Sequence, residues 1–180
     1  MQSDRNGRLF WPILVAVVLS DVVTKAAAVG MLGASGVAHP IAGDWLRFTL
    51  VYNPGAAFGL HVGDHSRWVF MALTIGALLI LGRLYFTTTP GDRARITSLA
   101  LVCGGAVGNL IDRIRGERGV VDFIDIGVRD TRWPTFNVAD MAVSIGAFLL
   151  AIVLWAEDRP AEPVPAVVSG EFRQNSGEAT

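Results

Sequence analysis

Four long apolar stretches, separated by shorter polar segments, dominate the pattern of the chain. They cover roughly residues 9–29, 68–86, 96–111 and 138–155. An α-helix needs about 20 residues to cross about 30 Å of hydrocarbon, and each stretch approaches that length, although the third is short and interrupted by glycines. The pattern predicts an all-α membrane protein with four transmembrane helices. Four crossings would leave both chain termini on the same side of the membrane.

A short β element is predicted between the first two helices. Residues 45–52 alternate in character, and one face of this segment carries Leu46, Phe48, Leu50 and Tyr52. A period of two is typical of a strand, which here ends at the turn Asn53-Pro54-Gly55. We therefore expect a small extramembrane β element between helices 1 and 2. Residues 56–59 then mix small side chains with one aromatic, which suits close approach to a ligand or tight packing.

The composition agrees with a membrane domain. Of the 180 residues, 52% are hydrophobic and the mean hydropathy is +0.46, which is too apolar for an ordinary soluble domain. The net charge of -1 gives no reason to propose a nucleic-acid partner. We expect one membrane domain over residues 1–156. Residues 157–180 form an acidic, proline-rich tail that lacks the apolar surface to offset the entropy of ordering, so we expect disorder there.

The first apolar stretch could be mistaken for a secretory signal, because Arg5 and Arg8 precede it. Its apolar part is too long for a signal, and Asp21 and Lys25 interrupt its second half, so we predict a retained anchor. The lone Cys103 lies among glycines in the third stretch, and we interpret it as a small packing residue rather than a nucleophile.

Charge alone does not determine the orientation in the membrane. Six arginines flank the predicted helices on one side, namely Arg5, Arg8, Arg83, Arg93, Arg95 and Arg159. The other side carries seven, namely Arg47, Arg67, Arg113, Arg115, Arg118, Arg129 and Arg132. This balance decides nothing under the positive-inside rule.

Two polar groups inside predicted helices have more than one interpretation. Asp21 and Lys25 are spaced i, i+4 and can pair, either as an interfacial ion pair that snorkels to the membrane surface or as a brace for loops near a catalytic site. In the third helix, Asn109, Asp112 and Arg113 share a face that should point into the bundle, with Asp112 in a salt bridge to Arg113. These three could be structural or could contact a substrate.

Small residues in the third helix predict a close helix contact. Ala100, Gly104 and Gly108 recur at a spacing of four, and Gly105 begins the adjoining stripe that continues to Asn109. Such a stripe lets a neighbouring backbone approach closely.

Two aspartates, Asp122 and Asp140, are the candidate catalytic residues. Asp122 follows the third apolar stretch and Asp140 opens the fourth, so folding back this hairpin could bring both carboxyls to one membrane face. A specific alternative exists for Asp140, because Asn137 could be the N-cap of the fourth helix and Asp140 its reciprocal partner in a capping box. Asp125 and Asp130 nearby also warn that carboxylates are common in this loop.

Five motifs, in order along the chain, resemble the lipoprotein signal peptidases (signal peptidase II), membrane aspartic proteases that cleave prolipoproteins. They are Asp21 with Lys25, Asn53-Pro54-Gly55-Ala56-Ala57-Phe58-Gly59, Gly104-Gly105-Ala106-Val107-Gly108-Asn109-Leu110-Ile111-Asp112-Arg113, Val121-Asp122-Phe123 and Phe136-Asn137-Val138-Ala139-Asp140. Each motif alone is weak, but five in the family's order, together with four predicted helices, make a specific match.

The resemblance implies a multi-pass enzyme of the cytoplasmic membrane, with cytoplasmic termini and an active site near the outer face. Its substrates would be diacylglyceryl-modified prolipoproteins, cut on the amino side of the modified cysteine, and we expect it to act as a monomer among membrane lipids without a cofactor or metal. The catalytic residues carry over to Asp122 and Asp140. Substrate-binding or supporting roles carry over to Asp21, Lys25, Asn53, Gly55, Ala57, Phe58, Gly108, Asn109, Asp112, Arg113 and Asn137.

Carboxyl chemistry fits this assignment. Two neighbouring carboxyls share one proton, so one can activate water while the other hydrogen-bonds the scissile carbonyl. A serine hydrolase with Lys25 as base is a rival, but Ser20 lies roughly 140° from Lys25 around a helix and Ser144 would have to come from another helix. A proton or ion transporter would place its carboxylates nearer to mid-membrane. A carboxylate-bound metal is a further alternative, although the histidines, His39, His61 and His65, all lie in the first loop.

Overall fold

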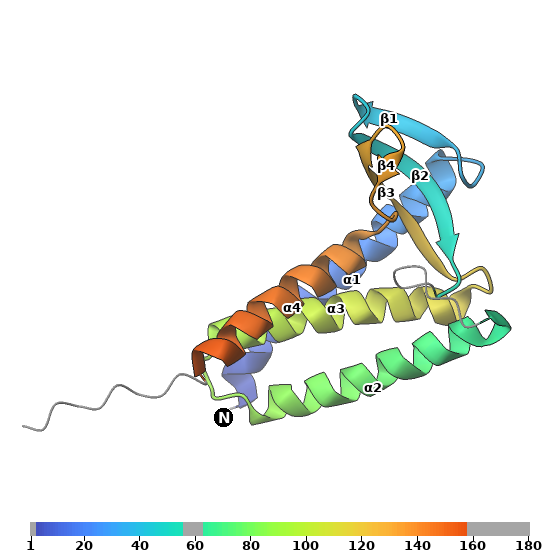
Figure 1. Cartoon of the computed structure of the whole chain (residues 1–180). Helices are drawn as coiled ribbons and strands as arrows, with labels where there is room; N and C mark the ends of the chain where they lie inside the picture. The colour runs from blue at the N-terminus through green and yellow to red at the C-terminus, as the bar shows by residue number, and fades with distance from the viewer. Residues whose placement is uncertain (1–2, 56–62, 158–180) are drawn as a thin grey trace, which may run out of the picture.

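The computed structural model describes residues 3–55 and 63–157, which form four long helices and a small antiparallel sheet (Figure 1). The helices are α1 (Ser3–Met31), α2 (Ser66–Thr87), α3 (Arg93–Arg115) and α4 (Val138–Glu157). All four are long and apolar enough to cross a membrane, with mean hydropathies of 2.0, 2.0, 1.4 and 2.2 in their most apolar windows. The predicted all-α membrane architecture is confirmed, and each helix extends beyond its apolar stretch by a few polar residues.

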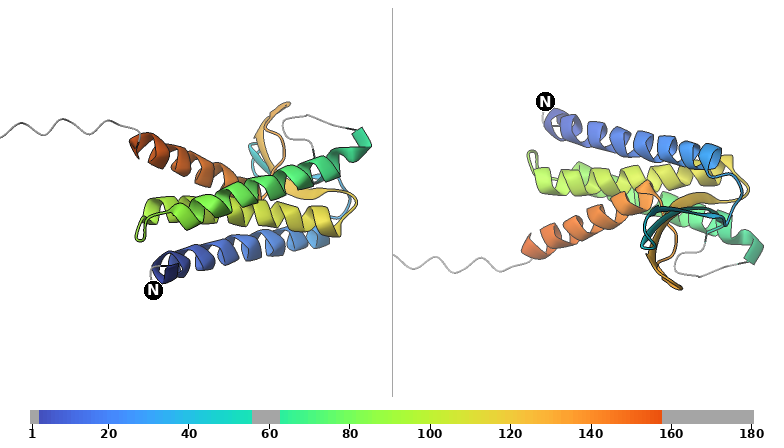
Figure 2. Two further views of the ribbon diagram at one scale, coloured as in Figure 1. Left: turned by 90° about the horizontal axis from the view of Figure 1, so that it is seen from below. Right: turned by 90° about the horizontal axis from the view of Figure 1, so that it is seen from above.

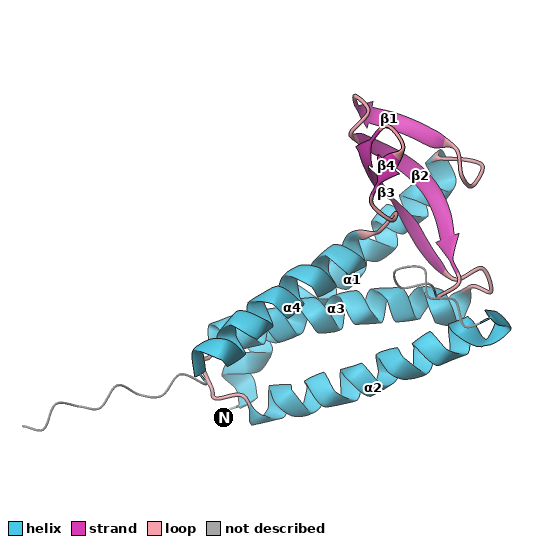
Figure 3. Cartoon of the chain, viewed as in Figure 1, coloured by secondary structure: helices cyan, strands magenta, loops and turns pink. Residues whose placement is uncertain are grey.

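The sheet lies at one end of the helices and contains strands from two separate loops (Figure 3). The loop after α1 supplies β1 (Ala38–Ala42) and β2 (Leu46–Asn53), and the loop after α3 supplies β3 (Val120–Val128) and β4 (Thr131–Arg132). All pairings are antiparallel, in the order β1-β2-β3-β4. The β element predicted between helices 1 and 2 is therefore present, and β3 and β4 enlarge it. A short 3-10 helix, η1 (Gly63–His65), precedes α2.

The third helix is the centre of the bundle, because α1, α2 and α4 all pack against it. Close packing depends on the predicted glycine stripes. A Cβ at Gly104 would lie 2.9 Å from Val17 Cβ of α1, and a Cβ at Gly105 would lie 2.3 Å from the Ala139 carbonyl oxygen of α4. Ordinary side chains at these positions would push the helices apart, so the glycines determine how closely α1 and α4 approach α3.

The second helix packs differently from the others. Among the long helices described, α2 brings its backbone close only to α3. Its side chains also reach α1, since the rings of Tyr85 and Phe10 lie 4.5 Å apart at the end remote from the sheet. Near the sheet, Arg67 of α2 holds the end of α3, since its Nε donates to the Arg113 carbonyl oxygen at 2.7 Å. Figure 2 shows that, near the sheet, α2 and α1 lie on different sides of α3.

An apolar core lies towards the end of the bundle that is remote from the sheet. Phe10, Ile96, Leu99 and Ala100 are buried there together with Cys103, which packs as expected of a small core residue. Large apolar side chains elsewhere on the helices are exposed, as expected of surfaces that face lipid, and they include Leu19, Leu79 and Phe148.

Both described ends of the chain lie at the same end of the bundle, opposite the sheet (Figure 2). The start of α1, the α2–α3 turn and the end of α4 meet there, as four crossings require. Glu157 is the last residue of α4 and pairs with Arg95 of α3. The rest of the predicted acidic tail, residues 158–180, lies outside the described residues, as do residues 56–59.

Candidate active site

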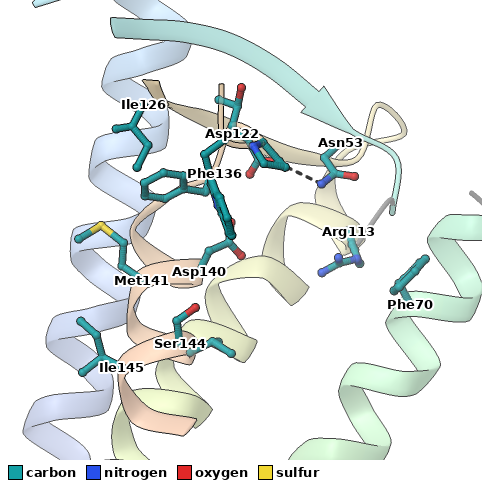
Figure 4. A pocket seen from close by; sticks show the side chains of 14 residues that line it. Asn53, Phe70, Arg113, Asp122, Ile126, Phe136, Asp140, Met141, Ser144 and Ile145 are labelled. Atoms are coloured by element: carbon teal, nitrogen blue, oxygen red, sulfur yellow. Dashed lines mark hydrogen bonds between the residues drawn. The ribbon is translucent and has the colours of Figure 1, made fainter. Parts of the chain in front are cut away.

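A cavity of about 680 Å³ opens where the sheet meets the helices (Figure 4). Four polar side chains line one part of it, and each comes from a different element. They are Asn53 at the end of β2, Arg113 near the end of α3, Asp122 on β3 and Asp140 in the first turn of α4. Residues more than 80 positions apart in sequence therefore face one space. All four are among the site residues predicted from the sequence.

Asp122 is placed by the pairing of β3 with β2, in which it lies opposite Val51. Its side chain is 3% exposed, and its two carboxylate oxygens accept hydrogen bonds from the amides of Asn137, at 2.7 Å, and Asn53, at 3.2 Å. Burial, with a further contribution from the charge of Asp140, raises the pKa of Asp122 to about 7, although the two amide hydrogen bonds lower it. This carboxyl can therefore hold a proton near neutral pH.

Asp140 belongs to a reciprocal capping box with Asn137. The Asp140 main-chain N–H donates to Asn137 Oδ1 at 2.9 Å, and the Asn137 main-chain N–H donates to Asp140 Oδ2 at 3.2 Å. The Asn109 amide donates to the other oxygen, Oδ1, at 2.8 Å. The capping interpretation of Asp140 is thus correct. It does not exclude a chemical role, because the same carboxyl lines the cavity beside Asp122.

Asn137 connects both aspartates and is fully buried. Its Nδ2 lies within hydrogen-bonding distance of Asp122 Oδ1, of Asn109 Oδ1 at 3.1 Å and of the Val121 carbonyl oxygen at 3.2 Å. The Asn137 amide therefore orients the Asp122 carboxyl, while its main-chain N–H binds the Asp140 carboxyl and its Oδ1 accepts from the Asp140 main-chain N–H.

Lys25 of α1 has three hydrogen-bond acceptors, one of which is Asn109. Its Nζ is 2.7 Å from Asp21 Oδ2, 2.8 Å from Asp112 Oδ2 and 2.9 Å from Asn109 Oδ1, which matches the three N–H donors of an ammonium group. The Asp21 and Lys25 side chains are 0% and 4% exposed. Burial contradicts the interpretation of a snorkelling surface pair. The contacts with Asn109 and Asp112 agree with the bracing interpretation, which stays a prediction. Because both side chains are buried, the pair contacts residues of α3 instead of facing the membrane surface.

The salt bridge expected between Asp112 and Arg113 is also wrong. Asp112 pairs with Lys25, and its Oδ2 also accepts from the Val121 main-chain N–H at 3.1 Å. Neighbouring residues on a helix point about 100° apart, so Arg113 faces the cavity while Asp112 faces α1 and the start of β3.

The fourth helix is tied directly to the first. Asp21 Oδ1 accepts from the Ala139 main-chain N–H at 2.9 Å. Gly108 leaves room for this contact, because a Cβ there would lie 2.6 Å from Asp21 Oδ2 and 3.3 Å from Ala139 Cβ. Gly108 was expected to support the site, and a supporting role through its lack of a side chain stays a prediction.

Arg113 lies on the cavity wall opposite Asp140 (Figure 4). One guanidinium nitrogen donates to the Asn109 carbonyl oxygen at 3.2 Å, and the guanidinium carbon is 6.0 Å from the ring centre of Phe70. Phe70 in turn covers Gly55, whose φ of 122° and lack of a Cβ permit the tight turn after β2. Ala57 and Phe58 lie outside the described residues.

The other part of the cavity is mostly apolar and was not predicted. It is lined by Ile126, Trp133, Phe136, Met141, Ser144 and Ile145. Met141 and Ile145 are one helical turn apart, and each directly follows a residue of the pair Asp140 and Ser144. This spacing could have indicated that all four residues lie towards the same side of α4. Trp133 carries no comparable signal, because the loop after β4 places it. Within residues 3–55 and 63–157, no group of three His, Cys, Asp or Glu side chains is arranged to hold a metal ion.

Comparison with known proteins gives consistent matches. The model of the signal peptidase (SPase) II family matches residues 13–156. A lipoprotein signal peptidase of Paraburkholderia phytofirmans is 41% identical over 83% of this chain and 87% of its own length. One from Burkholderia mallei is 43% identical over 77% and 82%. A solved structure described as a bacterial membrane enzyme has a TM-score of 0.70 at 31% identity, covering 83% of this chain and 91% of its own.

Proposed function

Because the chain belongs to the signal peptidase II family, whose members remove signal peptides from prolipoproteins, we propose that Asp122 and Asp140 carry out this hydrolysis as an aspartic dyad. The observation that carries the proposal is their shared cavity. Among the described residues that line it, Asp122 and Asp140 are the two carboxylic acids, and one has a pKa of about 7. Such a pair can hold a single proton between two carboxyls at neutral pH.

The two carboxyls would start the reaction in different states. Asp122 holds the proton and hydrogen-bonds the oxygen of the scissile carbonyl. Asp140 is the carboxylate, since it accepts hydrogen bonds from Asn109 and Asn137 and lies in the positively polarised first turn of α4. It takes a proton from a water molecule, whose oxygen then attacks the carbonyl carbon as Asp122 donates its proton to the carbonyl oxygen.

The second half of the reaction restores both groups. The tetrahedral intermediate carries two hydroxyls, and Asp140 now carries the proton taken from water. Asp140 gives this proton to the peptide nitrogen as the C–N bond breaks, and Asp122 regains a proton from a hydroxyl of the intermediate. The products are a carboxylic acid and an amine, so water is the only other reactant. Neither a covalent intermediate nor a metal takes part.

The apolar part of the cavity supports a lipid-modified peptide substrate. Trp133, Met141 and Ile145 would contact apolar parts of the signal peptide, while Arg113 and Asn53 face the polar backbone near the dyad. We propose cleavage on the amino side of a diacylglyceryl-modified cysteine, with the acyl chains remaining in hydrocarbon beside the helices. The enzyme would act as a monomer, because one chain supplies both carboxyls and their supporting residues.

We propose that the termini are cytoplasmic and that the dyad lies near the outer face of the membrane. In support, Asp122 is on β3 and Asp140 is in the first turn of α4. Figure 1 shows the sheet and the start of α4 at one end of the bundle and both described chain ends at the other. Signal peptides of exported prolipoproteins reach the outer face, so a dyad at that face would meet its substrate after export.

Incubation with matched substrates tests the proposal. The purified full chain should shorten a diacylglyceryl-modified prolipoprotein on a gel and leave its unmodified form intact. A chelator should not inhibit, and Ser144→Ala, a change in the same cavity, should retain substantial activity. Abolition by Ser144→Ala would favour the serine mechanism. Failure to cleave either substrate would contradict the proposed hydrolysis.

A further inference from the structure

A second cavity, of about 460 Å³, lies at the end of the bundle opposite the dyad. Its lining residues come from the first turns of α1 and α3 and from the α2–α3 turn. Figure 2 shows these segments at the end of the bundle where the chain starts. Three arginines line it: Arg5 and Arg8 of α1 and Arg93 of α3. Two of them precede residue 13, where the family match begins, so this cavity uses residues outside the matched part of the chain.

Hydrogen bonds between α1 and the α2–α3 turn hold one side of the cavity in place, which distinguishes it from a cluster of surface arginines. Asn6 is 8% exposed and joins α1 to the α2–α3 turn, because its Nδ2 donates to the Thr88 carbonyl oxygen at 3.3 Å and its Oδ1 accepts from the Gly91 main-chain N–H at 3.1 Å. A Cβ at Gly91 would lie 3.9 Å from a guanidinium nitrogen of Arg5. These contacts hold the arginines of α1 close to the start of α3.

The charge of the cavity is predominantly positive. Its one acidic lining residue with a described side chain, Asp92, is already engaged, since it accepts from the Arg95 main-chain N–H at 3.0 Å and lies 3.7 Å from Arg95 Nε. Within the described part of the chain, no ion pair involves Arg5 or Arg93, and both side chains are exposed. The N-terminal ends of α1 and α3 add partial positive charge.

The base of the cavity is apolar. Ile96 is 1% exposed and Leu9 is half-buried, and both line the cavity below the arginines. Arginines that only direct membrane insertion need no cavity. An arginine rim above an apolar base instead matches a molecule with an anionic head and an apolar body, and a guanidinium binds phosphate oxygens in a bidentate manner.

We propose that this cavity binds the phosphodiester headgroup of an anionic membrane phospholipid. The phosphate would lie between Arg5 and Arg93, and the glycerol would contact Leu9 and Ile96. Basic pockets between transmembrane helices at the cytoplasmic surface are suited to such headgroups. The bound lipid would hold the start of α1 against the α2–α3 turn, and it would stabilise the bundle without taking part in the chemistry at the other end.

Lipid-dependent stability of the full chain in detergent tests this site. Phosphatidylglycerol should raise the Tm of the wild type, and phosphatidylcholine at the same concentration should not. In the double variant Arg5→Gln/Arg93→Gln, the apparent Kd for phosphatidylglycerol should be at least about tenfold weaker, since each lost guanidinium removes charge-assisted hydrogen bonds. Without lipid, the double variant should keep its Tm, because both side chains are exposed.

The matched control is Arg83→Gln, which removes an exposed arginine near the same end of the bundle but outside the cavity. It should keep the wild-type response to phosphatidylglycerol. An equal loss of response in Arg83→Gln, or equal stabilisation by both lipids, would overturn the proposed site. Inorganic phosphate separates the two sources of the anion, since stabilisation by phosphate as strong as that by phosphatidylglycerol would overturn the lipid assignment.

Discussion

Asn137 and Asp140 hydrogen-bond each other in both directions, at 2.9 and 3.2 Å, and so fix the position of the Asp140 carboxyl relative to the axis of α4. A proposed catalytic group is thereby also a helix cap. Any substitution of Asp140 changes the start of α4 as well as the chemistry, so activity and stability have to be measured together.

Asp122→Asn and Asp140→Asn should each slow cleavage of a lipidated prolipoprotein by at least ~100-fold, the usual scale of general acid-base catalysis. Both changes are nearly isosteric, so both variants should fold and bind substrate. Asp125→Asn is the matched control. Asp125 is buried on the same strand and binds Thr49 and Arg132 at 3.0 and 2.5 Å, but it does not line the cavity. Its replacement should lower Tm and leave cleavage within a few-fold, and an active Asp122→Asn protein would refute the dyad.

The pH dependence of cleavage should reflect Asp122, whose pKa is raised from 3.8 to about 7. Cleavage should fall as the pH rises above about 7, because Asp122 then loses the proton that it shares with the scissile carbonyl. A rate that stays constant from pH 6 to pH 9 would contradict this assignment of the proton.

Stability should respond to the same titration. Unfolded Asp122 releases its proton near pH ~4 and the folded form retains it up to about 7, so over this range the folded chain binds more protons and the free energy of unfolding falls as pH rises. Asp122→Asn cannot titrate. Its Tm relative to wild type should therefore increase between pH 5 and pH 8, and a difference independent of pH would show that the carboxyl is not perturbed.

Lys25→Gln should destabilise the fold by about 3–5 kcal/mol, because it leaves the buried Asp21 carboxylate and the mostly buried Asp112 without a cation. The double variant Asp21→Asn/Lys25→Gln should be more stable than Lys25→Gln alone, since one of the two unpaired charges is gone. Arg47→Gln, which disrupts the partly exposed pair with Asp44, should cost less than about 1 kcal/mol and serves as the control. Equal Tm values for Lys25→Gln and Arg47→Gln would contradict the bracing role.

Gly105→Ala should separate α4 from α3, because its Cβ would lie 2.3 Å from the Ala139 carbonyl oxygen. We expect a loss of about 1–3 kcal/mol from overpacking and reduced cleavage, since Ala139 precedes Asp140. Gly76→Ala on α2 meets nothing within 4 Å and should be neutral or stabilising by up to about 1 kcal/mol. Detergent melting curves of the two alanine variants, measured beside cleavage rates, give the comparison. A Gly105→Ala protein as stable as Gly76→Ala would contradict the tight contact.

Much of this architecture could be predicted from local pattern. The helices follow from apolar length, β2 from its period of two, and the cap of α4 from the spacing of Asn137 and Asp140. The strand β3 was not predicted, because Asp122 and Asp125 interrupt its apolar alternation. Both carboxyls are accepted in the strand only because groups from other elements bind them, and no spacing along the chain shows this.

The partners of Lys25 on α3 also could not be predicted from the local sequence pattern. The sequence shows Asp21 one helical turn away, but Asn109 is 84 positions distant and is brought close by the packing of α1 on α3. The glycines at 104 and 108 predicted a close helix contact without identifying the helix. Tertiary packing selects α1, and this packing buries the pair that the sequence alone could have placed either at the membrane surface or inside the bundle.

The contact between Asp21 and Ala139 has a consequence for how the protein is made. Helices leave the ribosome in order, so α1 reaches the bilayer carrying a lysine and an aspartate before α3 and α4 exist to surround them. Lys25 can pair with Asp21 within α1 and with Asn109 and Asp112 once α3 is inserted. The Ala139 N–H reaches Asp21 only when the last helix has been inserted. Until then the proposed dyad is incomplete, and the nascent chain cannot cut the membrane proteins around it. A chain that terminates before α4 could still form the Lys25 contacts with α1 and α3, but it would leave Asp21 without the Ala139 N–H and would lack Asp140 altogether.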